Sequence, residues 1–190
     1  MRLKPTVCAV ALTFLVSAVP CSFAGNILVN GSFQDGDLTG WTLSGPSGLT
    51  VFCHAGFGYS AEDSDHCYAA LGSVGKDATI TQSFADTKGA SYQFSFWYDA
   101  NGTGPSDFNA DWDGTLLLGL TDTNTGGWVE YTFTEPGTGH DSISLGGYDN
   151  PSYDALDNVS VQTPEPATLA LLGTLLGLAG VVRRRKPHVL

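Results

Sequence analysis

Residues 91–98, Ser-Tyr-Gln-Phe-Ser-Phe-Trp-Tyr, decide the fold class of this chain. Side chains of a β-strand point alternately to its two faces. One face of this stretch is therefore aromatic and is formed by Tyr92, Phe94, Phe96 and Tyr98. The other face is formed by Ser91, Gln93, Ser95 and Trp97. The alternation predicts a strand whose aromatic side packs against a core.

The same kind of pattern extends over residues 25–162. Short runs rich in Val, Ile, Phe, Tyr and Thr alternate with clusters of Gly, Asn, Asp and Pro, and no helical periodicity interrupts them. The predicted strands are Ile27–Val29, Trp41–Leu43, Leu49–Phe52, Tyr68–Leu71, Thr79–Phe84, Ser91–Tyr98, Thr115–Leu120, Val129–Thr134, Ser142–Leu145 and Asn158–Val161. Strands with one apolar and one polar face are typical of a two-sheet antiparallel sandwich. The expected fold class is therefore all-β.

The N-terminus has the three parts of a secretory signal peptide. Arg2 and Lys4 precede an apolar run, Val7–Val19, and Ser22-Phe23-Ala24 places small residues at the −3 and −1 positions of a cleavage site. Residues 1–24 are thus predicted to form a signal helix that is removed on export. Lipidation at Cys21 is the alternative, although Pro20 stands where a small residue is expected.

The C-terminus, residues 163–190, predicts a short membrane segment. The run Ala167–Val182 holds no charge and is followed by the basic cluster 183–186, Arg-Arg-Arg-Lys. Sixteen helical residues span roughly 24 Å, less than a hydrocarbon core of ~30 Å. The positive-inside rule keeps the cluster on the cytoplasmic side. We therefore expect a marginal transmembrane helix over 167–182, with everything before it outside the inner membrane.

The order Pro-Glu-Pro, apolar helix and Arg cluster resembles the PEP-CTERM sorting signal of exported proteins in Gram-negative bacteria. The resemblance implies an exosortase, a membrane cysteine peptidase, as partner beside the export machinery. It implies anchoring in the inner membrane until processing, and then a place at the cell surface or in an extracellular matrix. The residues that carry the signal are Pro164, Glu165, Pro166, Arg183, Arg184 and Arg185.

The region between the two signals, 25–162, is strongly acidic. Its length of about 138 residues suits one domain with its own core. Of the 19 acids and 8 bases of the chain, one acid and six bases lie outside it, which leaves 18 acids and 2 bases and a formal charge of −16. Such a surface repels nucleic acid and anionic lipid, so we expect no nucleic-acid partner.

Two cysteines remain after removal of the signal peptide, Cys53 and Cys67. In an oxidising compartment such a pair predicts one disulfide. A zinc site is the alternative, because His54 and His66 adjoin the two cysteines. Neighbouring side chains of an extended chain point apart, so four converging ligands would need tight turns. The disulfide is the preferred interpretation.

Both ends of the domain carry a second resemblance. Residues 26–33, Asn-Ile-Leu-Val-Asn-Gly-Ser-Phe, followed by Gly-Trp at 40–41, and residues 155–161, Ala-Leu-Asp-Asn-Val-Ser-Val, resemble jelly-roll, galactose-binding-like domains of the carbohydrate-binding-module type. The resemblance implies a jelly-roll-like sandwich and a structural Ca²⁺ between its first and last strands. The matching positions are Gln34 and Asp157. The family usually has Glu where this chain has Gln34, so calcium would bind more weakly here.

A polysaccharide is the candidate ligand of the domain. Trp97 lies on the polar side of its strand, where an indole can stack on a sugar ring with Gln93 and Ser95 as hydrogen-bond partners. The preferred interpretation, however, is that Trp97 is covered by a loop or packs at the edge of the sandwich. The preferred function is a non-catalytic surface or matrix protein that binds exopolysaccharide. The other candidate is a secreted glycan hydrolase that uses carboxylates of the loop 101–114, such as Asp111 and Asp113.

Overall fold

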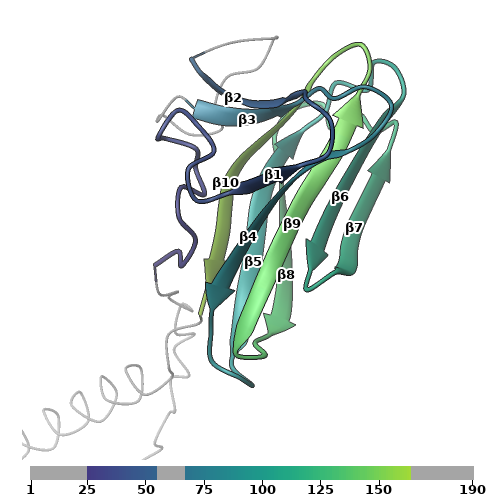
Figure 1. The fold of residues 1–190 in the computed structure, drawn as a ribbon. Helices are drawn as coiled ribbons and strands as arrows, with labels where there is room; N and C mark the ends of the chain where they lie inside the picture. The colour runs from purple at the N-terminus through teal and green to yellow at the C-terminus, as the bar shows by residue number, and fades with distance from the viewer. Residues whose placement is uncertain (1–24, 55–66, 164–190) are drawn as a thin grey trace, which may run out of the picture. The chain divides into compact units, whose positions relative to one another are not determined.

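The described part of the protein is a sandwich of two antiparallel β-sheets. The computed structural model describes residues 25–54 and 67–163, which belong to one compact unit. Each sheet has five strands (Figure 1). Sheet I has the order β1-β4-β9-β6-β7, and sheet II has the order β2-β3-β10-β5-β8. The all-β, antiparallel two-sheet prediction is therefore confirmed.

The strands of sheet I are β1 (Thr42–Ser44), β4 (Ala78–Ala85), β9 (His140–Asp149), β6 (Ser106–Trp112) and β7 (Thr115–Thr121). Those of sheet II are β2 (Leu49–Cys53), β3 (Cys67–Leu71), β10 (Asp154–Gln162), β5 (Ser91–Asp99) and β8 (Val129–Pro136). The expected signal helix (1–24) and transmembrane helix (167–182) lie outside the described residues. Within the described ranges, no helix has the length and apolarity that a membrane crossing needs.

The core lies between the sheets and is largely aromatic. The four aromatic side chains of β5 are buried, as the alternation predicts. They meet sheet I through Phe108 and Trp112: the Tyr98 and Phe108 rings stack with centroids 4.1 Å apart, and Phe94 lies 6.1 Å from Trp112. Burial of each such ring stabilises the fold by about 1.5–3 kcal/mol.

Strand β6 is absent from the sequence prediction, which treats 101–114 as a loop. The interpretation as a loop is wrong for Ser106–Trp112, which pairs with both β7 and β9. Asp107, Asn109 and Asp111 lie on the outer face of this strand, whereas Phe108, Ala110 and Trp112 are buried. The acidic residues alternate with apolar ones because only one face of the strand reaches the core.

The predicted strand Ile27–Val29 is not formed. This segment instead covers the open edge of the sandwich between β10 and β4. Ile27 N donates to Val161 O (3.0 Å), which ties the segment to β10. On the other side, Val29 N donates to Gln82 Oε1 (2.6 Å) and Gln82 Nε2 donates to Val29 O (2.9 Å). A glutamine side chain thus takes the place of a neighbouring strand.

Candidate functional site

An open hollow of about 490 Å³ lies where the N-terminal segment meets the outer side of sheet II. Trp97 of β5 forms one wall and is half-buried. The lining residues are Asn26, Leu28, Asn30, Gly31, Ser32, Trp97, Asn158, Val159, Ser160 and Gln162. The hollow therefore combines one indole with amide and hydroxyl side chains, and none of its lining residues is charged.

A bulge in β10 shapes the floor of the hollow. The pairing of β10 with β5 shifts between Asp157 and Ser160, and Asn158 adopts a left-handed backbone with φ of 48°. Asn tolerates this conformation better than most residues. The extra residue of a bulge bends its strand and disrupts the ladder locally. The N-terminal segment occupies the space beside this irregular part of β10.

Gly31 lets the N-terminal segment approach β10 closely. Val159 N donates to Gly31 O (2.9 Å), and a Cβ on Gly31 would lie 2.1 Å from Val159 O. No side chain larger than hydrogen fits without movement of the backbone. Asn26 fixes the same contact, since its Nδ2 donates to Val159 O (2.8 Å) and its Oδ1 accepts from Val161 N (3.0 Å).

Of Trp97 and its two predicted partners, only Trp97 lines the hollow. Gln93 and Ser95 lie on the same outer face of β5, opposite Gln162 and Ser160 of β10. The two β10 residues line the hollow, whereas Gln93 and Ser95 do not. Their role in ligand binding stays a prediction.

Sequence reasoning missed most of the polar lining. Asn26, Asn30 and Ser32 lie in the opening segment, about 65 residues before Trp97. The sequence of this segment resembles a first strand, and this resemblance hides its place in the lining. The signal that points to it is the cluster of Asn and Ser around a glycine, which is unusual in a strand.

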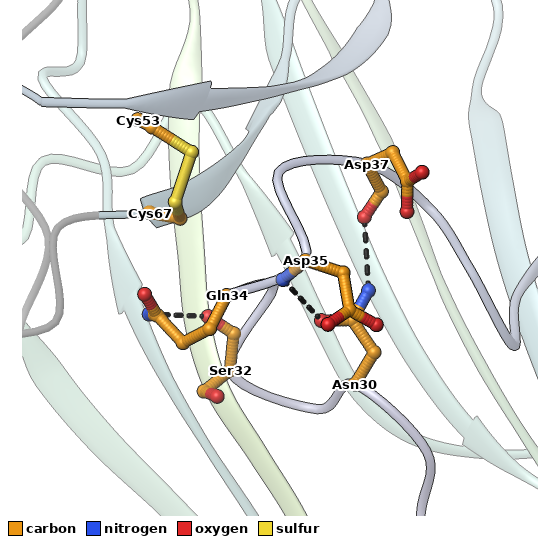
Figure 2. Close-up of a disulfide and its surroundings, with 7 residues drawn as sticks. All are labelled: Asn30, Ser32, Gln34, Asp35, Asp37, Cys53 and Cys67. Carbon is orange, nitrogen blue, oxygen red and sulfur yellow. Dashed lines mark hydrogen bonds between the residues drawn. A yellow bond between two sulfur atoms is a disulfide. The ribbon is translucent and has the colours of Figure 1, made fainter.

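The disulfide prediction is confirmed. Cys53 and Cys67 are joined with an S–S distance of 2.06 Å at the paired ends of β2 and β3 (Figure 2). Because both sulfurs are in the disulfide, they are not thiolate ligands for zinc. Gly36 lies against this bond, and a Cβ there would stand 3.5 Å from Cys53 Sγ. The disulfide thus packs beneath the loop that follows the N-terminal segment.

That loop is organised by Asn30. Its Oδ1 accepts from Asp35 N (3.2 Å), and its Nδ2 donates to Asp37 O (3.0 Å). Figure 2 shows Gln34 extending to one side of the loop and the Asp35 and Asp37 side chains to the other. Hydrogen bonds from the Thr39 side chain and backbone hold the pKa of Asp37 below its usual value.

The predicted calcium ligands suit a hard cation in their chemistry. Gln34 Nε2 donates to Ser32 O (2.8 Å), and Asp157 is buried with its Oδ1 accepting from Asn158 N (2.7 Å). An amide oxygen and a carboxylate are both calcium ligands. Within residues 25–54 and 67–163, no three His, Cys, Asp or Glu side chains gather as a metal site. The calcium site stays a prediction.

Of the two carboxylates that the hydrolase alternative would use, that of Asp113 holds a turn by hydrogen bonds. Asp113 lies in the β6–β7 turn, where its Oδ1 accepts from Ser142 N (2.8 Å) and from Ser142 Oγ (3.2 Å). Asp111 lies on the outer face of β6, and partial burial raises its pKa. The two residues belong to a strand and its tight turn rather than to a long loop.

Comparison with known proteins supports both resemblances. Residues 162–186 match the PEP-CTERM protein-sorting motif. No curated protein matches the sequence significantly. The fold is similar to that of TmCBM61, a carbohydrate-binding module solved with β-1,4-galactotriose, with a TM-score of 0.59 and 15% identity over 74% of this chain and 99% of that one.

Two further structures are similar at the level of the fold. The xylan-binding domain CBM22-1 of Xyn10C from Paenibacillus barcinonensis has a TM-score of 0.54 and 18% identity over 77% of this chain and 99% of that one. The enzymatically active domain of bacteriophage CBA120 tailspike protein 4 has a TM-score of 0.53 and 20% identity over 73% of this chain, which spans only 21% of that one. The chain thus carries a PEP-CTERM sorting motif after a domain with the jelly-roll sandwich fold of carbohydrate-binding modules.

Proposed function

We propose that this chain is a non-catalytic protein of the cell surface or extracellular matrix that binds exopolysaccharide in the hollow beside Trp97. It is exported, held in the inner membrane by its tail, and released when an exosortase processes it near Pro164–Pro166. The observation that carries the glycan proposal is the combination of one half-buried indole with uncharged amides and hydroxyls in a single hollow.

The chemistry of the lining favours a neutral, polyhydroxylated ligand. An indole packs against the apolar C–H face of a sugar, while amides and hydroxyls bond its hydroxyl groups. The formal charge of −16 over residues 25–162 would disfavour a polyanion unless a cation lay between. Neutral galactans, xylans and glucans are therefore the first polysaccharides to test.

The experiment is a glycan array followed by calorimetric titration of the exported protein. We expect binding without turnover, and a loss of about tenfold or more in affinity for Trp97→Ala, which corresponds to about 1.4 kcal/mol. Trp97→Phe should retain part of the affinity. Leu116→Ala is the matched control, because Leu116 is an exposed apolar residue of sheet I. Equal affinities of Trp97→Ala and the parent would reject the hollow as the binding site.

The hydrolase alternative predicts turnover instead. If the purified protein cleaves a polysaccharide and Asp111→Asn or Asp113→Asn abolishes the cleavage, the non-catalytic proposal is wrong. The location is tested by mass spectrometry of protein recovered from the cell surface. We expect a C-terminus near Pro164–Pro166, and an intact Leu190 would reject processing.

A structural calcium between Gln34 and Asp157 is the second part of the proposal. It would clamp the loop after the N-terminal segment to the last strand, and so stabilise one side of the hollow. We expect Asp157→Asn to lower the melting temperature in calcium more than in chelator. Equal effects in both conditions would count against calcium at this position.

A further inference from the structure

Two carboxylates meet inside the sandwich at the end where β9 passes into β10, uppermost in Figure 1. Asp149 ends β9 in sheet I, and Asp154 begins β10 in sheet II. Their side chains are 1% and 2% exposed. Asp149 continues the inward-facing series of Ile143 and Leu145, and Asp154 precedes the inward-facing Leu156 by two residues.

The two side chains face each other across the core. The Asp149 carboxylate is close enough to act on the charge of Asp154. Tyr98 Oη donates to Asp154 Oδ2 over 2.6 Å. Ser106, which is 3% exposed, is the cross-strand partner of Asp149. The two carboxylates and the Tyr98 hydroxyl, from three strands, thus meet inside the sandwich, and Ser106 lies beside Asp149 in sheet I.

Three of the four carboxylate oxygens lack a hydrogen-bond donor. Both oxygens of Asp149 and Oδ1 of Asp154 are buried without any such partner in the described part of the chain. A buried carboxylate is strongly destabilising unless donors or an opposite charge accompany it. Asp149 has only the carboxyl of Asp154 as a partner, and Asp154 has in addition the Tyr98 hydroxyl and the Asn101 backbone. Two almost fully buried carboxyl groups with so few donors indicate a missing ligand.

The described residues supply no positive charge at this point. Lys76 and Lys88 are the two Lys or Arg residues within 25–162, and both are exposed. The imidazole of His140 is exposed as well, at the opposite end of β9. The compensating charge for Asp149 and Asp154 must come from solution.

We propose that Asp149 and Asp154 bind a calcium ion between the two sheets, beside the Tyr98 hydroxyl. Hard oxygen donors in an exported protein match calcium rather than a transition metal. With only two acidic ligands, the affinity belongs to the range of extracellular modules, about 10⁻⁴–10⁻³ M. The ion would join sheet I to sheet II at the β9–β10 connection.

This site is distinct from the one predicted at Gln34 and Asp157. Asp157 is the cross-strand partner of Trp97 and lies on that residue's outer face of sheet II. Burial raises the pKa of Asp154 to about 7, although the Tyr98 hydroxyl opposes the shift, and Asp149 adds to it. A shared proton is therefore the competing occupant of the carboxylate pair. The inference does not depend on glycan binding in the hollow.

The test uses the full-length, exported chain in mild detergent at neutral pH. Thermal unfolding is followed with calcium or with chelator, and bound terbium is followed by its sensitised emission. We expect calcium at ten times its Kd to raise the melting temperature of the parent by roughly 5 °C. The contribution of this site to the shift should vanish in Asp149→Asn and in Asp154→Asn. The full shift should persist in the control Asp107→Asn, because Asp107 lies on the outer face of β6.

Terbium emission keeps the test valid if an aspartate variant fails to fold. Tyr98 lies beside the proposed ion, so excitation through tyrosine should give emission that weakens in Tyr98→Phe at equal bound terbium. Absence of both the calcium shift and the emission in the parent means that the pair holds only a proton, which overturns the proposal. A shift of the full parental size in Asp149→Asn and Asp154→Asn, or an equal loss of the shift in Asp107→Asn, overturns it too.

Discussion

Strand β9 carries a buried aspartate at each end, and the two carboxylates differ in the hydrogen-bond donors that surround them. Asp141, near the start, accepts hydrogen bonds from the Thr138 backbone N (3.1 Å to Oδ2) and from the Thr138 hydroxyl. Asp149, at the end, accepts none from the backbone or hydroxyl groups of the described residues, and its carboxyl meets only that of Asp154. Both side chains are buried between the same sheets.

The difference follows from the adjoining loops. The loop before Asp141 brings Thr138 N and Oγ1 to its carboxylate, and Gly139 N donates to the neighbouring Asp86. The loop after Asp149 begins with Asn150, whose N donates to Pro105 O (3.3 Å), and continues with Pro151. Proline has no N–H to donate. Donors of the preceding loop thus compensate the charge of Asp141. The described residues after Asp149 offer no such donors, and the proposed calcium ion compensates that charge instead.

We expect the largest loss of stability for a substitution of Asp141, near the start of β9. Asp141→Ala leaves the part-buried donors of Thr138 without an acceptor and a cavity at a fully buried position, so we expect the free energy of unfolding to fall by about 3 kcal/mol. Urea unfolding followed by tryptophan fluorescence measures it. Thr138→Val, which removes only the hydroxyl donor, is the control and should cost about 1 kcal/mol. A smaller loss for Asp141→Ala than for this control would break the comparison.

For Asp149, at the end of β9, we expect a substitution to raise the free energy of unfolding rather than lower it. In the presence of chelator, Asp149→Asn removes one buried charge and gives Asp154 an amide donor. We expect the free energy of unfolding to rise by about 1 kcal/mol. The same denaturation measured in calcium should show no gain, because the parent then has its counter-charge. A loss in chelator comparable to that of Asp141→Ala would mean that the two ends are alike.

Acid titration sharpens the contrast. Burial acts to raise the pKa of Asp141, but hydrogen bonds from the Asp86 carboxyl and from Thr138 outweigh it and lower the pKa below 3.8. An acid whose folded pKa is lowered contributes stability above its unfolded pKa, and this is lost as pH falls through the folded value.

We therefore expect Asp141→Asn to flatten the loss of stability below about pH 4 in urea unfolding at a series of pH values. Asp107→Asn is the matched control, because burial and then the charge of Asp77 raise the pKa of Asp107. It should leave the acid limb in place. An unchanged acid limb in Asp141→Asn would argue that Asp141 is not the group that titrates.

The smallest effect is expected at Asp113, which holds the same end of β9 from the surface. Its two hydrogen bonds to Ser142 are exposed, and Asn tolerates its φ of 47°. Asp113→Asn should therefore cost less than about 1 kcal/mol. Differential scanning calorimetry detects the change. A loss as large as that of Asp141→Ala would show that exposure does not separate the two carboxylates.

Much of sheet II was predictable because its strands alternate cleanly. The aromatic face of β5 and the outer position of Trp97 follow from residue spacing alone. Strand β6 escaped prediction because Asp107, Asn109 and Asp111 are typical turn residues, and only the pairing with β9 shows that they face outward.

The two candidate sites depend on contacts that spacing does not encode. Asn158 lines the hollow because of a bulge, which shifts the alternation of β10. Asp149 and Asp154 are five positions apart but belong to different sheets. Both side chains point into the core because the chain crosses from sheet I to sheet II between them.

The central place of β10 in sheet II has a mechanical consequence. The strand leads directly toward the sorting tail, and it is bonded to β5 on one side and to β3 and the N-terminal segment on the other. A force applied to Thr163 along the axis of β10 would act on the hydrogen bonds of both ladders at the same time. The ladders would then be sheared, rather than opened one hydrogen bond after another. While the tail tethers the protein, the sandwich is therefore attached through the strand best placed to resist force.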